Sequence, residues 1–574
     1  MKKHLLTALF VGITLSGFSQ ALQWAYSFQN QAVMEAMTDV AANGTDRFAI
    51  IGNGNSGISM DPIGGSPMYN SSGNFIACYN ASAAIQWIQP AVGSTFGVQL
   101  AANGDVYVCG GFSGTQDFDP AGGSFPLTAT GFDSYLQKFN ADGTFAWAAA
   151  ASAEGTASEI EVLADGRIIV AGRSDVDATV TLSNSSTVTL LKGVFILEFS
   201  ATGSLTNAFS ISVPAPAGYG YVYELTSDAS NNVYLGGSLD GIADFDLGAG
   251  TANNVATSAY DAYCVKYNSS FQLQWFRQFG DDNTPTGWDK LRGLAVDAAG
   301  NVYAGGEFTW TTDFDIANPG THVLISDPAS QAPSGFLLQW NSAGALNWVK
   351  KIGNNNGGIP TESAQVAVTQ IALQNNTLYA GFEGWGYWDV DPSGSNTILE
   401  VGAVASPGIG FGKYSDAGNY LAAFSIDTNA ASSGLTTVGF GMLGTDQFVT
   451  AGKFNKRLDF DPTGGSTFLQ TDVNGGFYEF DNDLYIAKYG FGGITAVNER
   501  PLGSAIQLYP NPFQTQLWVA QDANPNPLRV NIYDAQGKLI ATAIPDMQGS
   551  INTTDLTAGF YTVEVLSGSP ARLL

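Results

Sequence analysis

The sequence predicts an all-β protein: a seven-bladed β-propeller of four-stranded antiparallel blades, followed by a small C-terminal β-sandwich. Three observations predict this fold. An Asp-x-Asp motif recurs along the chain, each copy lies among short segments of alternating polarity, and successive copies are about 67 residues apart. A unit that recurs at such a long period is typical of stacked or radially arranged modules.

The motif first appears complete as Asp117-Phe118-Asp119-Pro120, and Ser59-Met60-Asp61-Pro62 is a partial copy. The later copies are Asp244-Phe245-Asp246, Asp313-Phe314-Asp315, Asp389-Val390-Asp391-Pro392 and Asp459-Phe460-Asp461-Pro462. The long interval between 119 and 246 holds one degenerate unit, from Ile168 to Phe199, which lacks both carboxylates. The units therefore number seven.

Each unit contains the strands of one blade. An alternating segment precedes the motif (105–112), and two follow it, one with an aromatic end (134–139) and one with a tryptophan (145–147). Period-two patterning and turns such as Ala141-Asp142-Gly143 indicate β-strands. Four short antiparallel strands form a propeller blade.

The two ends of the repeat region complement each other. The segment Leu22–Tyr26 resembles the tryptophan-bearing fourth strand of a blade, yet no first strand precedes it. The seventh unit ends after Leu484–Tyr489 without such a strand. We therefore expect the Trp24 strand to complete the last blade and to remove an exposed sheet edge.

The first 19 residues are predicted to be a secretory signal peptide. Lys2 and Lys3 precede an apolar run from Leu5 to Leu15, and small residues, Gly17 and Ser19, occupy the −3 and −1 positions of a cleavage site after Ser19. No other run approaches the roughly 20 apolar residues of a membrane span. The expected mature chain is soluble and exported.

The composition excludes some partners. Loss of the signal peptide would change the net charge from −28 to about −30, which disfavours nucleic acid and anionic lipid. Charged residues are only 13% and aromatic residues are 12%, which fits a turn-rich β protein rather than a disordered acidic chain. Cys78, Cys109 and Cys264 form no disulfide framework, and one disulfide stays open as an alternative. His322 is the one histidine left after the signal peptide, which excludes a multi-histidine metal site.

The domains are predicted as a signal peptide (1–19), a propeller (20–497), a linker (498–505) and a C-terminal domain (506–574). The last of these contains Leu508-Tyr509-Pro510-Asn511-Pro512-Phe513, Ile532-Tyr533-Asp534 and the segment 555–565. By pattern alone this is a small β-sandwich. The same residues closely resemble the type A C-terminal sorting domain of the type IX secretion system of Bacteroidetes. The resemblance implies recognition by that machinery, passage across the outer membrane, removal of the domain, and then attachment to the surface or release.

The repeat region, about residues 22–495, also resembles secreted bacterial β-propeller repeats that carry a DFDP-type motif. This resemblance supports the fold and implies no single activity.

The carboxylate pairs have two interpretations. Residues i and i+2 of a strand face the same side, so the pairs could bind Ca²⁺ together with backbone carbonyls. Alternatively, each Asp accepts backbone N–H bonds in an Asx-type turn, the interpretation that we favour. The candidate calcium ligands are Asp117, Asp119, Asp244, Asp246, Asp313, Asp315, Asp389, Asp391, Asp459 and Asp461. We expect no other cofactor and predict no catalytic residue, since carboxylates repeated in every blade have like environments.

Residues outside the repeat pattern are candidates for binding. Trp288, Trp310, Trp385 and Trp388 fall within about one hundred residues, with Tyr387, Lys290, Arg292, Lys350 and Lys351 nearby in sequence. Aromatic residues beside scarce cations predict a face that binds a glycan or a peptide. The alternative is that the four tryptophans fill longer loops or the core.

The sequence thus favours a secreted or cell-surface binding or adhesion module, which we expect to be a monomer. An extracellular glycosidase or lyase that uses Asp and Tyr, and a structural surface protein, are the two alternatives.

Overall fold

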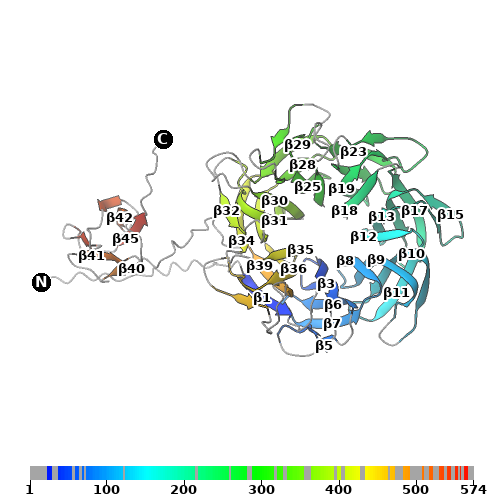
Figure 1. Ribbon diagram of the computed structural model, residues 1–574, viewed down its shortest axis with the longest axis horizontal. Coiled ribbons are helices and arrows are strands. Elements are labelled where there is room, and N and C mark those ends of the chain that lie inside the picture. Colours follow the sequence, from blue (N-terminus) through cyan, green and yellow to red (C-terminus); the bar gives the residue numbers. More distant parts are fainter. Residues whose placement is uncertain are drawn as a thin grey trace. The chain divides into compact units, whose positions relative to one another are not determined.

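The computed structural model forms a closed ring of β-sheets (Figure 1). It describes residues 22–28, 36–54, 58–63, 68–69, 73–119, 123–213, 218–256, 260–280, 287–315, 320–327, 332–353, 364–393, 397–402, 407–426, 434–462, 466–471, 482–491, 507–509, 516–520, 529–534, 539–543, 550–553, 556 and 561–566. The predicted signal peptide and linker lie outside these residues. The chain divides into two compact units. One is the propeller, residues 19–496, and the other comprises residues 497–574 with 1–18.

Seven blades of four antiparallel strands make the ring, and further short strands extend the sheets of blades 3 and 6. No helix occurs among the described residues. Blade 1 contains β2 (Ala36–Ala42), β3 (Arg47–Gly54), β6 (Gly73–Asn80) and β7 (Ile85–Pro90). Blade 2 contains β8 (Ser94–Leu100), β9 (Val106–Asp117), β10 (Pro126–Phe139) and β11 (Phe145–Ala151). Blade 3 contains β12 (Gly155–Val162), β13 (Ile168–Ser174), β16 (Gly193–Phe199) and β17 (Leu205–Ser212). Blade 4 contains β18 (Tyr219–Ser227), β19 (Val233–Asp240), β22 (Asp261–Tyr267) and β23 (Leu273–Phe279).

Blade 5 contains β24 (Lys290–Val296), β25 (Val302–Phe308), β28 (Ser334–Trp340) and β29 (Leu346–Ile352). Blade 6 contains β30 (Gln365–Gln374), β31 (Thr377–Asp389), β33 (Gly408–Ser415) and β34 (Tyr420–Ile426). Blade 7 contains β35 (Leu435–Met442), β36 (Gln447–Asn455), β39 (Asn482–Gly490) and β1 (Leu22–Phe28). The predicted all-β class and the count of seven blades are confirmed.

Short ribbons follow the second strand of the blades. They are formed by β4 (Ile58–Ser59) and β5 (Met68–Tyr69), β14 (Ala178–Thr181) and β15 (Thr187–Leu190), β20 (Ile242–Asp244) and β21 (Asn253–Val255), β26 (Thr311–Asp313) and β27 (Val323–Ile325), β32 (Ile398–Val401) with β31, and β37 (Arg457–Asp459) and β38 (Phe468–Gln470). In blade 2 the extended ends of β9 and β10 pair in the same way. These ribbons account for the extra length of the repeat units relative to common propeller blades.

The first strand of each blade lines the central channel. Adjacent first strands, such as β2 and β8 or β12 and β18, contact each other around the ring. In every blade the register between the first and second strands shifts by one residue, which marks a β-bulge. The bulge brings a first-strand carbonyl close to the second strand. A Cβ on Gly110 would lie 1.8 Å from the carbonyl oxygen of Ser94, and one on Gly237 would lie 1.9 Å from that of Tyr221. The glycines of the repeat therefore allow this close approach.

The N-terminal strand closes the ring. β1 pairs antiparallel with β39, with Trp24 opposite Lys488 and Phe28 opposite Leu484. Figure 1 shows β1, at the blue end of the sequence, beside the orange β39. The Trp24 indole donates to the carbonyl oxygen of Ala81 in blade 1 (3.2 Å) and stacks on Phe48. The predicted closure is confirmed.

The C-terminal unit contains two three-stranded antiparallel sheets. One consists of β40 (Gln507–Tyr509), β41 (Gln516–Ala520) and β44 (Ser550–Asn552). The other consists of β43 (Leu539–Ala543), β42 (Arg529–Asp534) and β45 (Tyr561–Leu566). The predicted sandwich packing of the two sheets stays a prediction. In the described part of the chain, no helix is long and apolar enough to cross a membrane.

Candidate functional site: the mouth of the central channel

The seven bulges place one side chain from each blade in the channel. A channel cavity of about 390 Å³ is lined by all seven first strands, including the bulge residues Thr38, Phe96, Ser158, Tyr223, Arg292, Thr369 and Val438. The backbone feature repeats, whereas the side chain differs from blade to blade. The channel can therefore carry a specific site on a repetitive fold.

In three of the seven blades, the residue after the bulge makes a hydrogen bond to the next blade. The Asp39 carboxylate accepts from the Val98 N–H of blade 2 (2.9 Å), and the Gln370 side-chain oxygen accepts from the Phe440 N–H of blade 7. Glu224 likewise accepts from the Leu294 N–H of blade 5. Each receiving blade has a glycine at its own post-bulge position: Gly97, Gly293 and Gly439.

Because the number of blades is odd, the post-bulge position cannot alternate between a hydrogen-bond acceptor and a glycine around the whole ring. The mismatch falls between blades 3 and 4, where the post-bulge residues are Glu159 and Glu224. Burial, then the charges of Glu224 and Asp39, raise the pKa of Glu159. Burial and the same type of charge repulsion also raise the pKa of Glu224, although its backbone hydrogen bonds oppose the shift. The charged forms of both carboxyls are therefore disfavoured at this junction.

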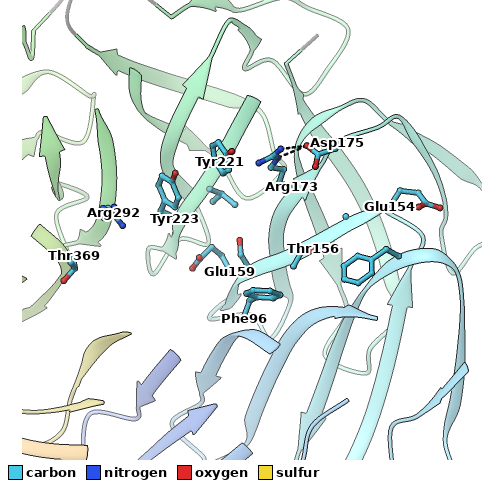
Figure 2. Close-up of a pocket in the computed structure, with 14 residues that line it drawn as sticks. Phe96, Glu154, Thr156, Glu159, Arg173, Asp175, Tyr221, Tyr223, Arg292 and Thr369 are labelled. Atoms are coloured by element: carbon cyan, nitrogen blue, oxygen red, sulfur yellow. Dashed lines mark hydrogen bonds and ion pairs between the residues drawn. The ribbon is translucent and has the colours of Figure 1, made fainter. Parts of the chain in front are cut away.

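A wider cavity of about 730 Å³ forms the channel mouth (Figure 2). Phe96 and Phe132 line it with rings that are 43% and 40% exposed. Tyr221 and Tyr223 lie nearly parallel, with an interplanar angle of 7° and ring centroids 5.9 Å apart. Six residues line both the mouth and the channel and so mark the junction between them: Phe96, Ser158, Glu159, Tyr223, Arg292 and Thr369.

The cations that line the mouth are paired. Arg173 bonds to Asp175, as Figure 2 shows, and its guanidinium lies 4.5 Å from the Tyr221 ring centroid. Arg292 and Lys290 both lie 2.9 Å from the Glu307 carboxylate. Burial acts to raise the pKa of Glu307, but these two cations outweigh it and the pKa is lowered.

The aromatic surface extends from the mouth onto blades 4 and 5. Tyr260 contacts Tyr221 at 5.9 Å and Trp288 at 6.2 Å between ring centroids. Trp288 is 53% exposed, and Lys290 lies over its ring at 5.1 Å. Tyr219 is 39% exposed beside Arg173 and Lys192. We call Tyr219, Tyr221, Tyr223, Tyr260 and Trp288 the aromatic rim.

The structure separates the tryptophans that the sequence grouped. Trp288 belongs to the aromatic rim, whereas Trp310 is a half-buried residue beside the blade 5 ribbon. Trp385 and Tyr387 are half-buried on blade 6, and the Tyr387 hydroxyl bonds to Glu400. Trp388 lies in the core rather than on a surface, because its indole is fully buried and donates to the carbonyl oxygens of Gln365 and Trp385. Its ring is therefore not accessible to a ligand. For Trp310, Trp385 and Tyr387, ligand binding stays a prediction.

The first carboxylate of each complete motif closes an Asx turn. The same Asp117 oxygen accepts from the N–H groups of Asp119 (3.0 Å) and Phe125 (2.8 Å). Corresponding bonds are made by Asp244, Asp389 and Asp459, and Asp313 bonds to Asp315 and Gly320. The residue between the two carboxylates is buried in every copy. These bonds match the favoured interpretation.

No three His, Cys, Asp or Glu residues are grouped to hold a metal ion in the described residues. Calcium binding by the motif stays a prediction. The three cysteines are free and buried. His322 lies 3.6 Å from Asp315, beside a motif carboxylate.

Most of this site escaped sequence reasoning. Phe96, Glu159 and Tyr223 lie in the first strands, where the repeat pattern is weakest. A signal was available in Gly97, Gly293 and Gly439, which break the strand pattern at one position of the blade. Isolated glycines in a strand suggest a bulge or a close backbone approach.

Comparisons with solved structures show remote likeness. A protein of unknown function from Bacteroides caccae aligns at 14% identity and a TM-score of 0.29, covering 66% of this chain and 92% of that one. A variant of an ACO/RPE65 chimera aligns at 9% identity and a TM-score of 0.34, covering 78% and 95%. A DUF4221 family member from Bacteroides vulgatus aligns at 10% identity and a TM-score of 0.24, covering 70% and 93%. Such low scores carry no argument about function.

No curated protein matches the chain. Residues 507–572 match the family model of the secretion system C-terminal sorting domain. This tail indicates export by the type IX secretion system to the cell surface or the extracellular space.

Proposed function

We propose that this exported propeller is a binding module that takes a glycan at the mouth of its central channel. The observation that carries the proposal is the aromatic rim beside a cavity of about 730 Å³. Solvent-exposed rings on a rigid sheet offer flat apolar area at small entropic cost, which suits the flat faces of sugar rings. Polar groups such as Thr156, Ser158 and Thr369 also line the cavity and can bond to hydroxyl groups.

The position of the rim on the scaffold supports the same conclusion. The rim is built by strands of blades 4 and 5 and their flanking residues, so the scaffold holds the rings in place. Residues that repeat in every blade serve the architecture, whereas the rim and cavity residues differ between blades. Adhesion to a glycan-bearing surface is the role that we infer for an exported module of this kind.

A glycan array tests the proposal directly. The purified chain should retain a defined set of glycans without changing them, and Trp288→Ala should weaken that retention. Hydrolysis or cleavage of a bound glycan would instead indicate a carbohydrate-active enzyme. If the folded chain binds no glycan on the array, the result would contradict the proposal and favour a structural surface protein.

A further inference from the structure

We propose that the floor of the channel mouth recognises a free amino group on the glycan, with Glu159 as the counter-ion of its ammonium form. This inference rests on the proposed function and specifies its ligand: an oligosaccharide that contains unacetylated amino sugars.

Glu159 lacks the hydrogen bond that its counterparts make. Asp39, Glu224 and Gln370 each accept an N–H from the next blade, beside a glycine. The blade that follows Glu159 has Glu224 at the glycine position, and the Leu225 N–H is taken by the Glu224 carboxylate itself. Within the described residues, Glu159 therefore makes no hydrogen bond or ion pair. Glu159 is half-buried on the wall of the cavity, and a partly desolvated carboxyl without a partner is costly unless it has a function.

The charges around Glu159 favour a cation. Arg173 and Arg292, the two cations that line the mouth, are already paired with Asp175 and Glu307. Glu159 faces Glu224 on the neighbouring strand β18 and Asp39 on β2, two blades away, with Glu161 on its own strand. The groups here that lack a charged partner are thus carboxyls, which become negative when they ionise. An ammonium group would offset both the desolvation and the repulsion that raise the pKa of Glu159.

The position of Glu159 suits a sugar that also contacts aromatic rings. Figure 2 shows its side chain between those of Tyr223 and Phe96, which are bulge residues of the blades on either side. A ring held against these aromatic faces would project a substituent toward the carboxylate. The cavity lies within the roughly 300 to 1,000 Å³ that is usual for small-molecule sites.

Calorimetric titration with two oligosaccharides tests the inference. Glucosamine hexamer and N-acetylglucosamine hexamer differ in the acetyl groups that remove the cation. We expect the glucosamine hexamer to bind at least about tenfold more tightly, as one close charge pair allows. Glu159→Gln should abolish this preference, whereas Glu400→Gln, on the blade 6 ribbon outside the cavity, should preserve it. Equal melting temperatures would confirm that both variants fold.

A second measurement keeps the test independent of folding. Because the Glu159 pKa is raised in the free protein, binding of the cation should release a proton, which titrations in buffers of different ionisation enthalpy detect. Equal binding of the two hexamers would overturn this inference and leave the proposed function intact. Binding of neither hexamer, while the array retains glycans without amino groups, would also overturn it. Failure of both hexamers and of the whole array would instead reject the proposed function.

Discussion

Removal of β1 should destabilise the whole propeller. The perturbation is a chain that lacks residues 20–30, so that blade 7 ends at β39. That strand would then expose unpaired N–H and C=O groups from Leu484 to Tyr489, together with apolar side chains. Because β1 joins the two ends of the ring without a covalent link, its loss opens the ring at one seam.

The magnitude follows from the side chains that β1 buries. Phe28 is 1% exposed, Leu22 is 7% exposed and Ala25 is 9% exposed. Burial of a Phe or Leu contributes about 1.5 to 3 kcal/mol each and an Ala methyl about 0.8 kcal/mol, so the strand supplies about 4 to 7 kcal/mol. Net stabilities are about 5 to 15 kcal/mol, so this loss removes a large fraction. Phe28→Ala alone should cost about 3 to 5 kcal/mol.

Urea denaturation followed by tryptophan fluorescence measures the effect. We expect a much lower midpoint for the truncated chain, and a smaller decrease for Phe28→Ala. A chain that ends at Ala496 is the control, because residues from Val497 onward form a separate unit. A truncated chain that unfolds at the midpoint of the full chain would refute the closure argument.

Four further predictions concern the channel and the motif. Burial raises the pKa of Glu161 to about 7, so the fold should lose stability as the pH rises from about 4.5 to about 7. Its bonds to Gln99 and Ser227 remain available to an amide, so Glu161→Gln should remove the Glu161 share of the pH dependence, at most about 3 kcal/mol, between denaturant titrations at pH 5 and pH 8. Asp39, Glu159 and Glu224, whose pKa values are also raised, should keep their own share. Gly97→Ala should cost about 1 to 3 kcal/mol because its Cβ would lie 2.6 Å from the Ser158 carbonyl oxygen, whereas the roomier Gly434→Ala should cost less; equal urea midpoints would contradict the bulge argument. Asp244→Ala should cost about 1 to 2 kcal/mol through two lost backbone hydrogen bonds. The wild-type melting temperature should be the same in Ca²⁺ and in chelator, and a rise in Ca²⁺ would favour the calcium interpretation instead.

The repeat made the fold readable from the sequence. Period-two strands, the Asp-x-Asp copies and the unpaired Trp24 strand all depend on local pattern or on chain order. Those features specify the order of the strands along the chain. The ring closure was predictable because the last unit lacks a fourth strand and the N-terminus supplies one.

The binding surface was harder to predict because it depends on contacts between blades. Trp288 and Trp388 are separated by about one and a half units of the repeat. They therefore lie on different blades, although the sequence grouped them. Trp288 reached the rim, while Trp388 packs in its own blade. Tyr221 and Phe96 were part of the regular strand pattern, and only the bulges turn Phe96 into the channel. A bulge changes which way a side chain points without changing the strand pattern of the sequence.

The central claim is that ligand binds at the channel mouth, and the affinity of one array-selected glycan for two variants tests it most directly. Phe96→Ala removes a ring that is 43% exposed in the cavity. Phe468→Ala removes a ring that is 48% exposed on the blade 7 ribbon and also lies beside a cation, Arg457. We expect Phe96→Ala to weaken binding by at least about tenfold, roughly 1.4 kcal/mol, and Phe468→Ala to leave it unchanged. Equal affinities for the wild type and Phe96→Ala, or a loss confined to Phe468→Ala, would contradict the assignment of the site.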